Sequence, residues 1–335
     1  GSDLYADILQ IAAADVVDGG PIAEVLEPVA AAPFGDAVLL RFLAALHLLV
    51  LTGRAPTLAA HFPSAGGRPG RDLGSAVVAT VEAHRSDLAG ALGRNVQTNE
   101  VGRSAVLLGG YLELARLGLP LRVLEVGASA GLNLLFDRYR CVASDGTACG
   151  PADAALTFAS PWFAAEPDLT VPVVVAERRG CDVDPIDVTA VEGRQRLRSF
   201  VWGDQLDRLS RLDAAIEIAR ADPPTVDRAS APAWLEQQVA DLDPGRTTVV
   251  AHSIVFQYLS EVERRDLLAV IDAAGRAATD HAPFAWLRLE PGGDQAELRL
   301  TSWPGGRTHL LARSAYHGPP VVWLAPAGGV LRPPS

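Results

Sequence analysis

One short segment limits the fold more than any other feature: RVLEVGASAGLNLLFDRYR, residues 122–140. Within it, Leu124-Glu125-Val126 leads directly into Gly127-Ala128-Ser129-Ala130-Gly131 and then into a helical pattern. Glycine permits the backbone conformations that such a tight turn needs, and the amino end of the following helix favours anionic groups. In open parallel sheets, ligands bind at the carboxyl ends of the strands. The segment therefore predicts a strand, a turn and a helix beside a nucleotide-cofactor pocket.

The region after Pro120 alternates strand and helix patterns, which is typical of a parallel sheet covered by helices on both faces. Strands are expected at residues 122–126, 171–176, 199–202, 247–251 and 284–289. Helices are expected at residues 132–139, 188–196, 206–220, 233–240 and 261–278. Beyond Glu290, the stretches ELRLTSW, THLLARS and VVWLAP predict shorter strands of an antiparallel edge.

The first 120 residues have the apolar spacing of helices. Asp36 can cap a helix at residues 37–51, a second pattern covers residues 73–92, and Asn99 can cap a third at residues 100–117. We therefore predict a helical amino-terminal region, 1–120, and a Rossmann-like cofactor-binding domain, 121–335. The long connection between the first and second strands predicts an insertion near residues 140–170.

Acidic residues follow the predicted second and third strands. Asp182 follows Gly180-Cys181, where a carboxylate can accept hydrogen bonds from both hydroxyls of a ribose. Asp184 and Glu177 are the alternatives if the strand is shifted. The stretch FVWGDQ, residues 200–205, predicts a third strand whose Asp204, with Gln205 beside it, would hold an adenine amino group.

These features resemble class I S-adenosylmethionine-dependent methyltransferases over about residues 121–289. The acid and GxGxG turn that end their first strand are matched by Glu125, Gly127, Ser129 and Gly131, although the middle glycine is here a serine. Asp182 and Asp204 match the acids that end the second and third strands. The resemblance implies a methyltransferase-type Rossmann-like sheet, S-adenosylmethionine as cofactor and methyl transfer to a small-molecule substrate. The whole chain also resembles an actinobacterial family called domain of unknown function 2332, through QTNEVGRSA, LEVGASAGLN, RRGCDVDPID and the WGDQ stretch.

Candidate catalytic residues follow the predicted fourth strand. His252 at the strand end would act as a general base, and Tyr258 on the following loop would orient the acceptor. A second polar cluster is expected to cover the cofactor or substrate pocket, with helix capping as the simpler alternative: Gln97, Asn99, Glu100 and Arg103.

Two other functions remain open on the same residues. Gly127 to Gly131 also reads GxSxG, the nucleophile turn of α/β-hydrolases. Ser129 would then be the nucleophile, Asp182 or Asp204 the acid, and His252, His309 or His317 the base. A protein of the same fold that binds a nucleotide without catalysis is the third possibility.

Charge and cysteine content limit the partners and the location. A net charge of −11 argues against sequence-independent binding of nucleic acid. Three cysteines without a CxxC pair predict a reduced intracellular protein and no structural metal. The apolar stretch 37–51 is too short to span a membrane, so we expect no membrane association and a cytoplasmic location. The oligomeric state is left open.

Overall fold

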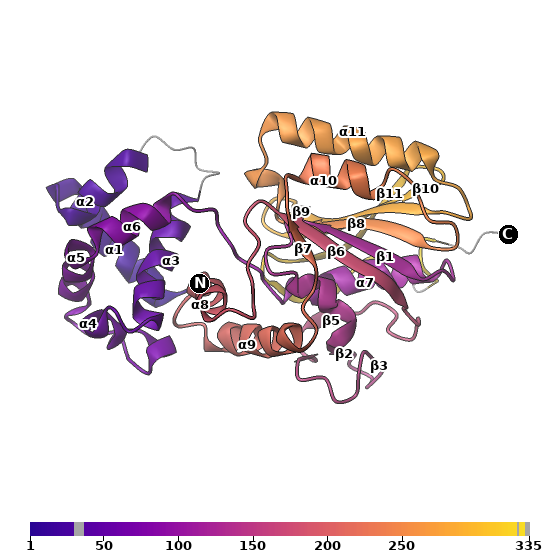
Figure 1. Cartoon of the computed structure of the whole chain (residues 1–335). Coiled ribbons are helices and arrows are strands. Elements are labelled where there is room, and N and C mark those ends of the chain that lie inside the picture. Colours follow the sequence, from indigo (N-terminus) through magenta and orange to yellow (C-terminus); the bar gives the residue numbers. More distant parts are fainter. Residues whose placement is uncertain (30–36, 327, 332–335) are drawn as a thin grey trace. The chain divides into compact units, whose positions relative to one another are not determined.

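The computed structural model describes residues 1–29, 37–326 and 328–331, and its contacts divide the chain into two compact units (Figure 1). Unit 1 consists of Gly1–Thr98 and Ile186–Asp213, and unit 2 of Asn99–Pro185 and Ala214–Ser335. The helix α9, Leu206–Ala221, contains the last boundary. The predicted cap Asp36 lies outside the described residues. In the described part of the chain, no helix has both the length and the apolar character needed to cross a membrane.

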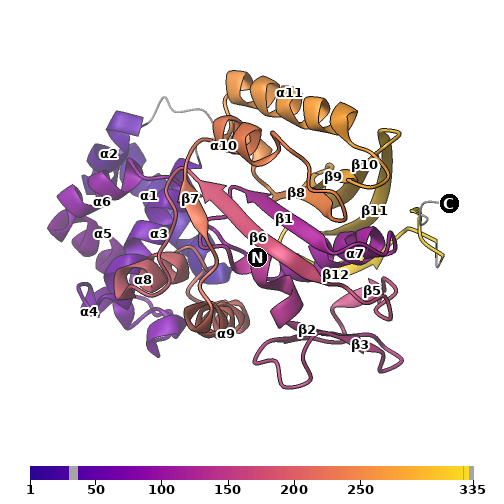
Figure 2. The ribbon, with the colours of Figure 1, turned by 45° about the vertical axis from the view of Figure 1, so that its right-hand side comes forward.

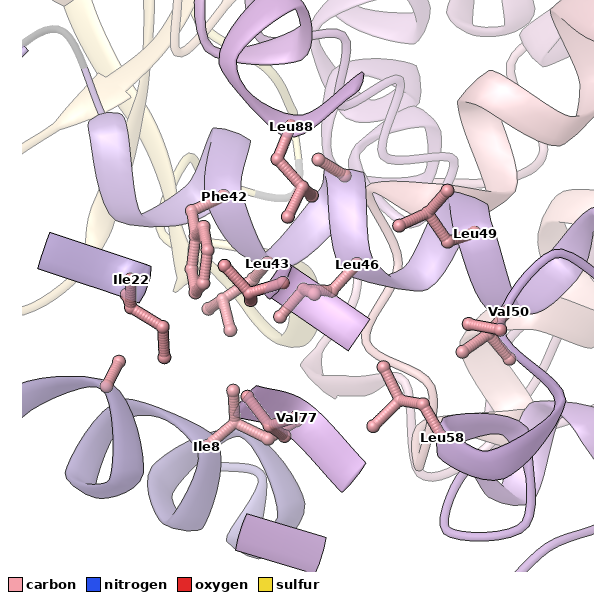
Figure 3. Close-up of a cluster of buried hydrophobic side chains, with 14 of the residues drawn as sticks. Ile8, Ile22, Phe42, Leu43, Leu46, Leu49, Val50, Leu58, Val77 and Leu88 are labelled. Atoms are coloured by element: carbon pink, nitrogen blue, oxygen red, sulfur yellow. The ribbon is translucent and has the colours of Figure 1, made fainter. Parts of the chain in front are cut away.

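Unit 1 is helical, as predicted for the amino-terminal region, and its core is a cluster of aliphatic and aromatic side chains (Figure 3). Phe42 and Leu46 of the apolar helix α3 lie in this cluster with Ile8, Ile22 and Leu88 from neighbouring helices. The predicted helix at residues 73–92 is interrupted at His84. The helices are α1 Asp3–Asp18, α2 Pro21–Leu26, η1 Glu27–Val29, α3 Val38–Leu51, α4 Pro56–Ala59, η3 Pro63–Ala65, α5 Leu73–Ala83, α6 Arg85–Leu92 and α8 Val191–Ser199.

Unit 2 is built on a mostly parallel sheet with the order β5-β12-β11-β10-β9-β8-β1-β6-β7 (Figure 2). The strands are β1 Leu121–Val126, β5 Phe163–Ala165, β6 Val175–Asp182, β7 Val226–Arg228, β8 Thr247–Ser253, β9 Phe284–Pro291, β10 Ala296–Trp303, β11 Arg307–Ala315 and β12 Gly318–Trp323. In the parallel half, β7-β6-β1-β8-β9, the strands stand in the chain order third, second, first, fourth, fifth. This is the order of a Rossmann-like sheet, and its switch point lies between β1 and β8.

Helices cover both faces of this sheet, as the alternating pattern predicted. All six residues of β1 are buried, as expected for a parallel strand between two helical layers. The helix α7, Arg103–Ala115, packs on one face, and α10, Ala231–Gln238, with α11, Glu261–Ala277, packs on the other (Figures 1 and 2). The expected antiparallel edge is present as β10, β11 and β12.

Two strand predictions are wrong. The second strand runs from Val175 to Asp182 rather than over residues 171–176, because β1 pairs with this later segment. Residues 199–202 form no strand: Ser199 ends α8, and the third strand of the sheet is β7. The apolar stretch at Val201 and Trp202 instead packs within unit 1, where Trp202 stacks on Tyr5 with ring centroids 5.4 Å apart. A short apolar run does not by itself distinguish a strand from a buried helix end.

The segment between β1 and β6 contains a 3₁₀ helix and a small separate sheet. The 3₁₀ helix η4, Leu132–Arg138, replaces the helix expected at residues 132–139. The small sheet has the order β3-β2-β4, with β2 Arg140–Val142, β3 Ala148–Cys149 and β4 Thr157–Phe158.

Candidate functional site

The glycine-rich turn joins the central strand β1 to η4 with an alternation of left-handed residues. Gly127, Ser129 and Gly131 have φ values of 67°, 55° and 72°. A β-carbon at Gly127 would lie 2.7 Å from Val255 Cγ2, and one at Gly131 would lie 2.7 Å from Pro224 Cγ. The two glycines are therefore required by backbone conformation and by contacts within the chain.

Asn99 holds this turn from the segment before α7. Its Oδ1 accepts hydrogen bonds from the backbone N–H groups of Ala130 and Leu132, at 3.3 and 3.1 Å. The predicted capping of a helix by Asn99 is wrong, because α7 begins at Arg103 with Gly102 as its N-cap. Asn99 instead accepts hydrogen bonds from N–H groups of the turn that the sequence predicted to bind the cofactor.

Glu125 is the most unusual acid of this region. It is the penultimate residue of β1, and its side chain is buried, with Oε2 lacking a hydrogen-bond partner in the described structure. Burial raises the pKa of this carboxyl to about 8, although the hydrogen bond from Asn133 lowers the pKa in part. Ser129 is also buried, and its Oγ has no partner among the described residues. Two buried polar atoms therefore remain unsatisfied at the carboxyl end of β1.

Asp182 ends β6 next to the same turn. Its Oδ2 accepts a hydrogen bond from the Ser129 N–H at 2.9 Å, and its Oδ1 accepts one from the Asp184 N–H at 2.9 Å. The register of β6 thus brings the predicted second-strand acid to the glycine-rich turn. The alternative acid Glu177 lies inside the strand, where its Oε2 is 3.1 Å from Arg122 Nε.

Arg103 and Glu100 connect the start of α7 to two other loops of unit 2. The Arg103 guanidinium donates through Nη1 to the Ser253 carbonyl at 3.1 Å and through Nε to the Tyr316 carbonyl at 3.0 Å. Glu100 Oε1 accepts the Gly102 N–H at 3.1 Å, and its Oε2 is 3.5 Å from Nδ1 of His317. Of the polar cluster predicted before the first strand, Asn99 therefore reaches the turn after β1, and Arg103 reaches the end of β8.

His252 lies on β8 inside a buried network. Its Nδ1 donates to Glu290 Oε1 at 2.7 Å, while its Nε2 accepts from Trp286 Nε1 at 2.9 Å. The ring is fully buried and stacks on Phe256, with centroids 4.8 Å apart. Both ring nitrogens are thus committed to protein groups, which argues against the predicted role of His252 as a base.

Glu290 is a site residue that sequence reasoning missed. It is the penultimate residue of β9, and its Oε1 also accepts the N–H groups of Val255 and Phe256, at 2.9 and 3.4 Å. Despite burial, which opposes ionisation, these donors and His252 lower the pKa of Glu290. An acid at the end of a parallel strand was the signal used for Glu125, and it could have identified Glu290. The loop it holds includes Ile254, whose φ of 54° is strained for a β-branched residue.

Four other predicted site residues remain to be placed in the fold. Gln97, Asp204 and Gln205 belong to unit 1, where Asp204 Oδ2 accepts a hydrogen bond from Ser2 Oγ at 2.6 Å. Their assigned contacts with cofactor or substrate stay predictions, and residues 199–202, from which the role of Asp204 was argued, form no strand. Tyr258 is 45% exposed on η5, Phe256–Tyr258, and its catalytic role also stays a prediction.

A cavity of about 420 Å³ lies between α7, the small-sheet region and β12. Its walls include Glu113, Asp145, Glu166, Asp168 and Trp323. None of the predicted cofactor, substrate or catalytic residues lines it. Over the described ranges, no group of three or more histidine, cysteine or acidic side chains is arranged to hold a metal ion.

A family model described as "Uncharacterized protein conserved in bacteria (DUF2332)" matches residues 1–323. No curated protein and no solved structure matches the chain.

Proposed function

We propose that this chain, which belongs to the DUF2332 family, is an S-adenosylmethionine-dependent methyltransferase that acts on a small-molecule acceptor. The observation that carries the proposal is the meeting of Glu125, Ser129 and Asp182 at the carboxyl ends of the adjacent strands β1 and β6. Rossmann-like sheets bind nucleotide cofactors in this crevice, beside the switch point of the strand order.

The unsatisfied atoms suit the amino-acid end of this cofactor. Leaving a buried polar atom without a partner costs free energy, so Glu125 Oε2 and Ser129 Oγ favour a ligand that supplies hydrogen-bonding groups. The ammonium group of S-adenosylmethionine would pair with Glu125, and Asp182 would accept hydrogen bonds from the ribose. The cofactor, when bound, supplies a methyl group on a positively charged sulfur.

The adenine end has weaker support. The acid of the third strand, Asp227, accepts two hydrogen bonds from Arg179 and one from Trp234, at 2.6 to 3.1 Å. It therefore serves the packing of β6, β7 and α10, and we do not assign it to the cofactor.

The loop after β8 would position the acceptor. The Val255 side chain fills the space that a β-carbon on Gly127 would need, so this loop and the glycine-rich turn are adjacent. Glu290 Oε2 has no hydrogen-bond partner in the described residues, so it is the carboxylate oxygen that is left to accept a proton. We assign to Glu290, rather than to His252, the acceptance of a proton from an acceptor that must lose one. His252 and the N–H groups of Val255 and Phe256 hold this carboxylate in position.

A serine hydrolase is the second candidate, favoured by the left-handed conformation of Ser129 (φ 55°), since a strained turn is typical of a nucleophile elbow. The arrangement lacks a base at the nucleophile, because Ser129 Oγ has no hydrogen-bond partner in the described structure and His252 is committed elsewhere. Labelling of Ser129 by a fluorophosphonate, lost in Ser129→Ala, would favour the hydrolase instead.

Calorimetric titration of the full chain with S-adenosylhomocysteine tests the proposal. We expect micromolar binding to the wild type and affinity weaker by about tenfold or more in Asp182→Asn, which loses a charged acceptor. Asp227→Asn is the matched control, because that acid lies on β7 of the same sheet and its oxygens accept hydrogen bonds from the Arg179 and Trp234 side chains. Absence of binding to the wild type would overturn the methyltransferase proposal.

The pH dependence of the same titration tests the contact with Glu125. An ammonium ligand prefers the ionised carboxylate, so affinity should rise with pH by up to about tenfold per unit and level off above the pKa of about 8. Glu125→Gln should abolish this slope. Equal slopes in the variant and the wild type would remove Glu125 from the cofactor site. Binding without any methyl transfer would favour the non-catalytic protein of the same fold.

A further inference from the structure

Two of the three cysteines face each other across a pair of strands. Cys141 on β2 is directly opposite Cys149 on β3 in an antiparallel register. Directly opposed residues of antiparallel strands have Cα atoms roughly 4.5–5.5 Å apart, which lies within the range that a disulfide spans. Both cysteines are free thiols in this structure, and the two side chains are hydrogen-bonded to each other.

The two thiols differ in access and in acidity. Cys141 is buried, whereas Cys149 is partly exposed. The hydrogen bond between them lowers the pKa of Cys149 and raises that of Cys141, and burial raises the pKa of Cys141 further. The positive charge of Arg140 also favours the thiolate of Cys149. The accessible sulfur is therefore the nucleophile, and the buried sulfur lies beside it.

We propose that Cys141 and Cys149 are a redox-active thiol pair that small-molecule disulfides oxidise reversibly to an intramolecular disulfide. The Cys149 thiolate attacks one sulfur of the reagent, breaking its S–S bond and releasing one thiolate. The Cys141 thiol then loses its proton to solvent and attacks Cys149 Sγ, which releases the second half of the reagent. Two protein thiols are oxidised, and one external disulfide is reduced to two thiols.

The disulfide would act on one wall of the cavity described above. The residues between the two cysteines form a turn, closed by a hydrogen bond from the Ala143 N–H to the Thr147 carbonyl at 2.8 Å. Ala143, Asp145 and Thr147 of this turn line the cavity. A bond across the base of the turn would therefore restrict the motion of that wall. This inference does not depend on the proposed methyltransferase activity.

Oxidised glutathione and peptide mapping test the proposal on the full chain. Trypsin cleaves after Arg140 and Arg178, so Cys141 and Cys149 lie in one peptide, 141–178, while Cys181 lies in another, 180–194. After treatment of the folded protein, we expect peptide 141–178 to lose two hydrogens and resist alkylation, and dithiothreitol to restore both thiols. Cys181 is the internal control, because burial raises its pKa to about 12 and it should stay reduced.

Variants separate the two steps of the reaction. Cys141→Ser should accumulate a mixed disulfide of glutathione with Cys149, because the second thiol is missing. Cys149→Ser should react slowly or not at all, and Cys181→Ser should behave like the wild type. Two alkylatable thiols in peptide 141–178 after oxidation, a persistent glutathione adduct in the wild type, or a crosslink to Cys181 would each overturn the proposal.

Discussion

The ends of β1 and β9 present the same residue in opposite electrostatic environments. Glu125 and Glu290 are each the penultimate residue of a parallel strand, and β8 lies between the two strands. Each carboxyl group has an Oε2 without a hydrogen-bond partner in the described part of the chain. Burial raises the pKa of Glu125 to about 8, whereas the pKa of Glu290 is lowered.

The difference comes from the donors that surrounding segments bring to the other oxygen. Glu290 Oε1 receives His252 Nδ1 and two backbone N–H groups, while Glu125 receives one side-chain hydrogen bond, from Asn133. Hydrogen bonds to the charged form offset desolvation only where enough of them converge. The protein itself therefore stabilises the ionised form of Glu290, whereas it provides Glu125 with too few donors to do so.

The largest effect is expected from removing the anchored carboxylate. Glu290→Ala leaves the His252 N–H and the Val255 N–H buried without their acceptor, which should lower the free energy of unfolding by about 3–4 kcal/mol. Glu290→Gln keeps an acceptor oxygen and should cost only about 1 kcal/mol. Urea unfolding at neutral pH measures both values. Equal costs for the two variants would show that the loop does not depend on these hydrogen bonds.

Replacing the Glu125 carboxyl group should instead raise the free energy of unfolding at neutral pH. Because the pKa of Glu125 is raised from 4.5 to about 8, its contribution to stability is full below pH 4.5 and is lost as pH rises through 8. Glu125→Gln should therefore stabilise the protein by about 3 kcal/mol at pH 7, because its advantage grows by roughly 1.4 kcal/mol per pH unit between pH 4.5 and 8. Thermal or urea unfolding at several pH values measures this difference. A constant difference would mean that Glu125 ionises normally.

Much of unit 2 could be predicted because its signals are local. The run from Leu121 to Val126 is buried on both faces, and its pattern predicted β1 directly. The fourth and fifth strands and the helix α11 were predicted nearly to the residue. Asn99 and Arg103 of the predicted polar cluster contact the turn after β1 and the end of β8, whereas the expected capping of a helix by Asn99 is wrong.

The errors occur where tertiary contacts override a local pattern. The chain leaves unit 2 after β6 and contributes residues 186–213 to unit 1, so the apolar segment around Trp202 packs on Tyr5 rather than in the sheet. No local sequence pattern marks the residues at which the chain enters and leaves unit 1. The hydrogen bonds of both His252 ring nitrogens could not be predicted either, because their partners Glu290 and Trp286 lie on β9, more than 30 residues away in sequence.

The smallest effect on stability is expected from variants of Ser129. Its backbone N–H is held by Asp182 in a left-handed conformation, which costs about 1 kcal/mol for a residue with a β-carbon, while its Oγ has no partner in the described structure. Ser129→Gly and Ser129→Ala both remove Oγ, but only glycine relieves the backbone strain. We therefore expect the glycine variant to exceed the alanine variant in unfolding free energy by about 0.5 kcal/mol, after the greater freedom of glycine in the unfolded chain is subtracted. If Oγ contacts the cofactor, both variants should lose S-adenosylhomocysteine affinity by the same factor. A loss in alanine alone would instead locate the effect in the conformation of the turn.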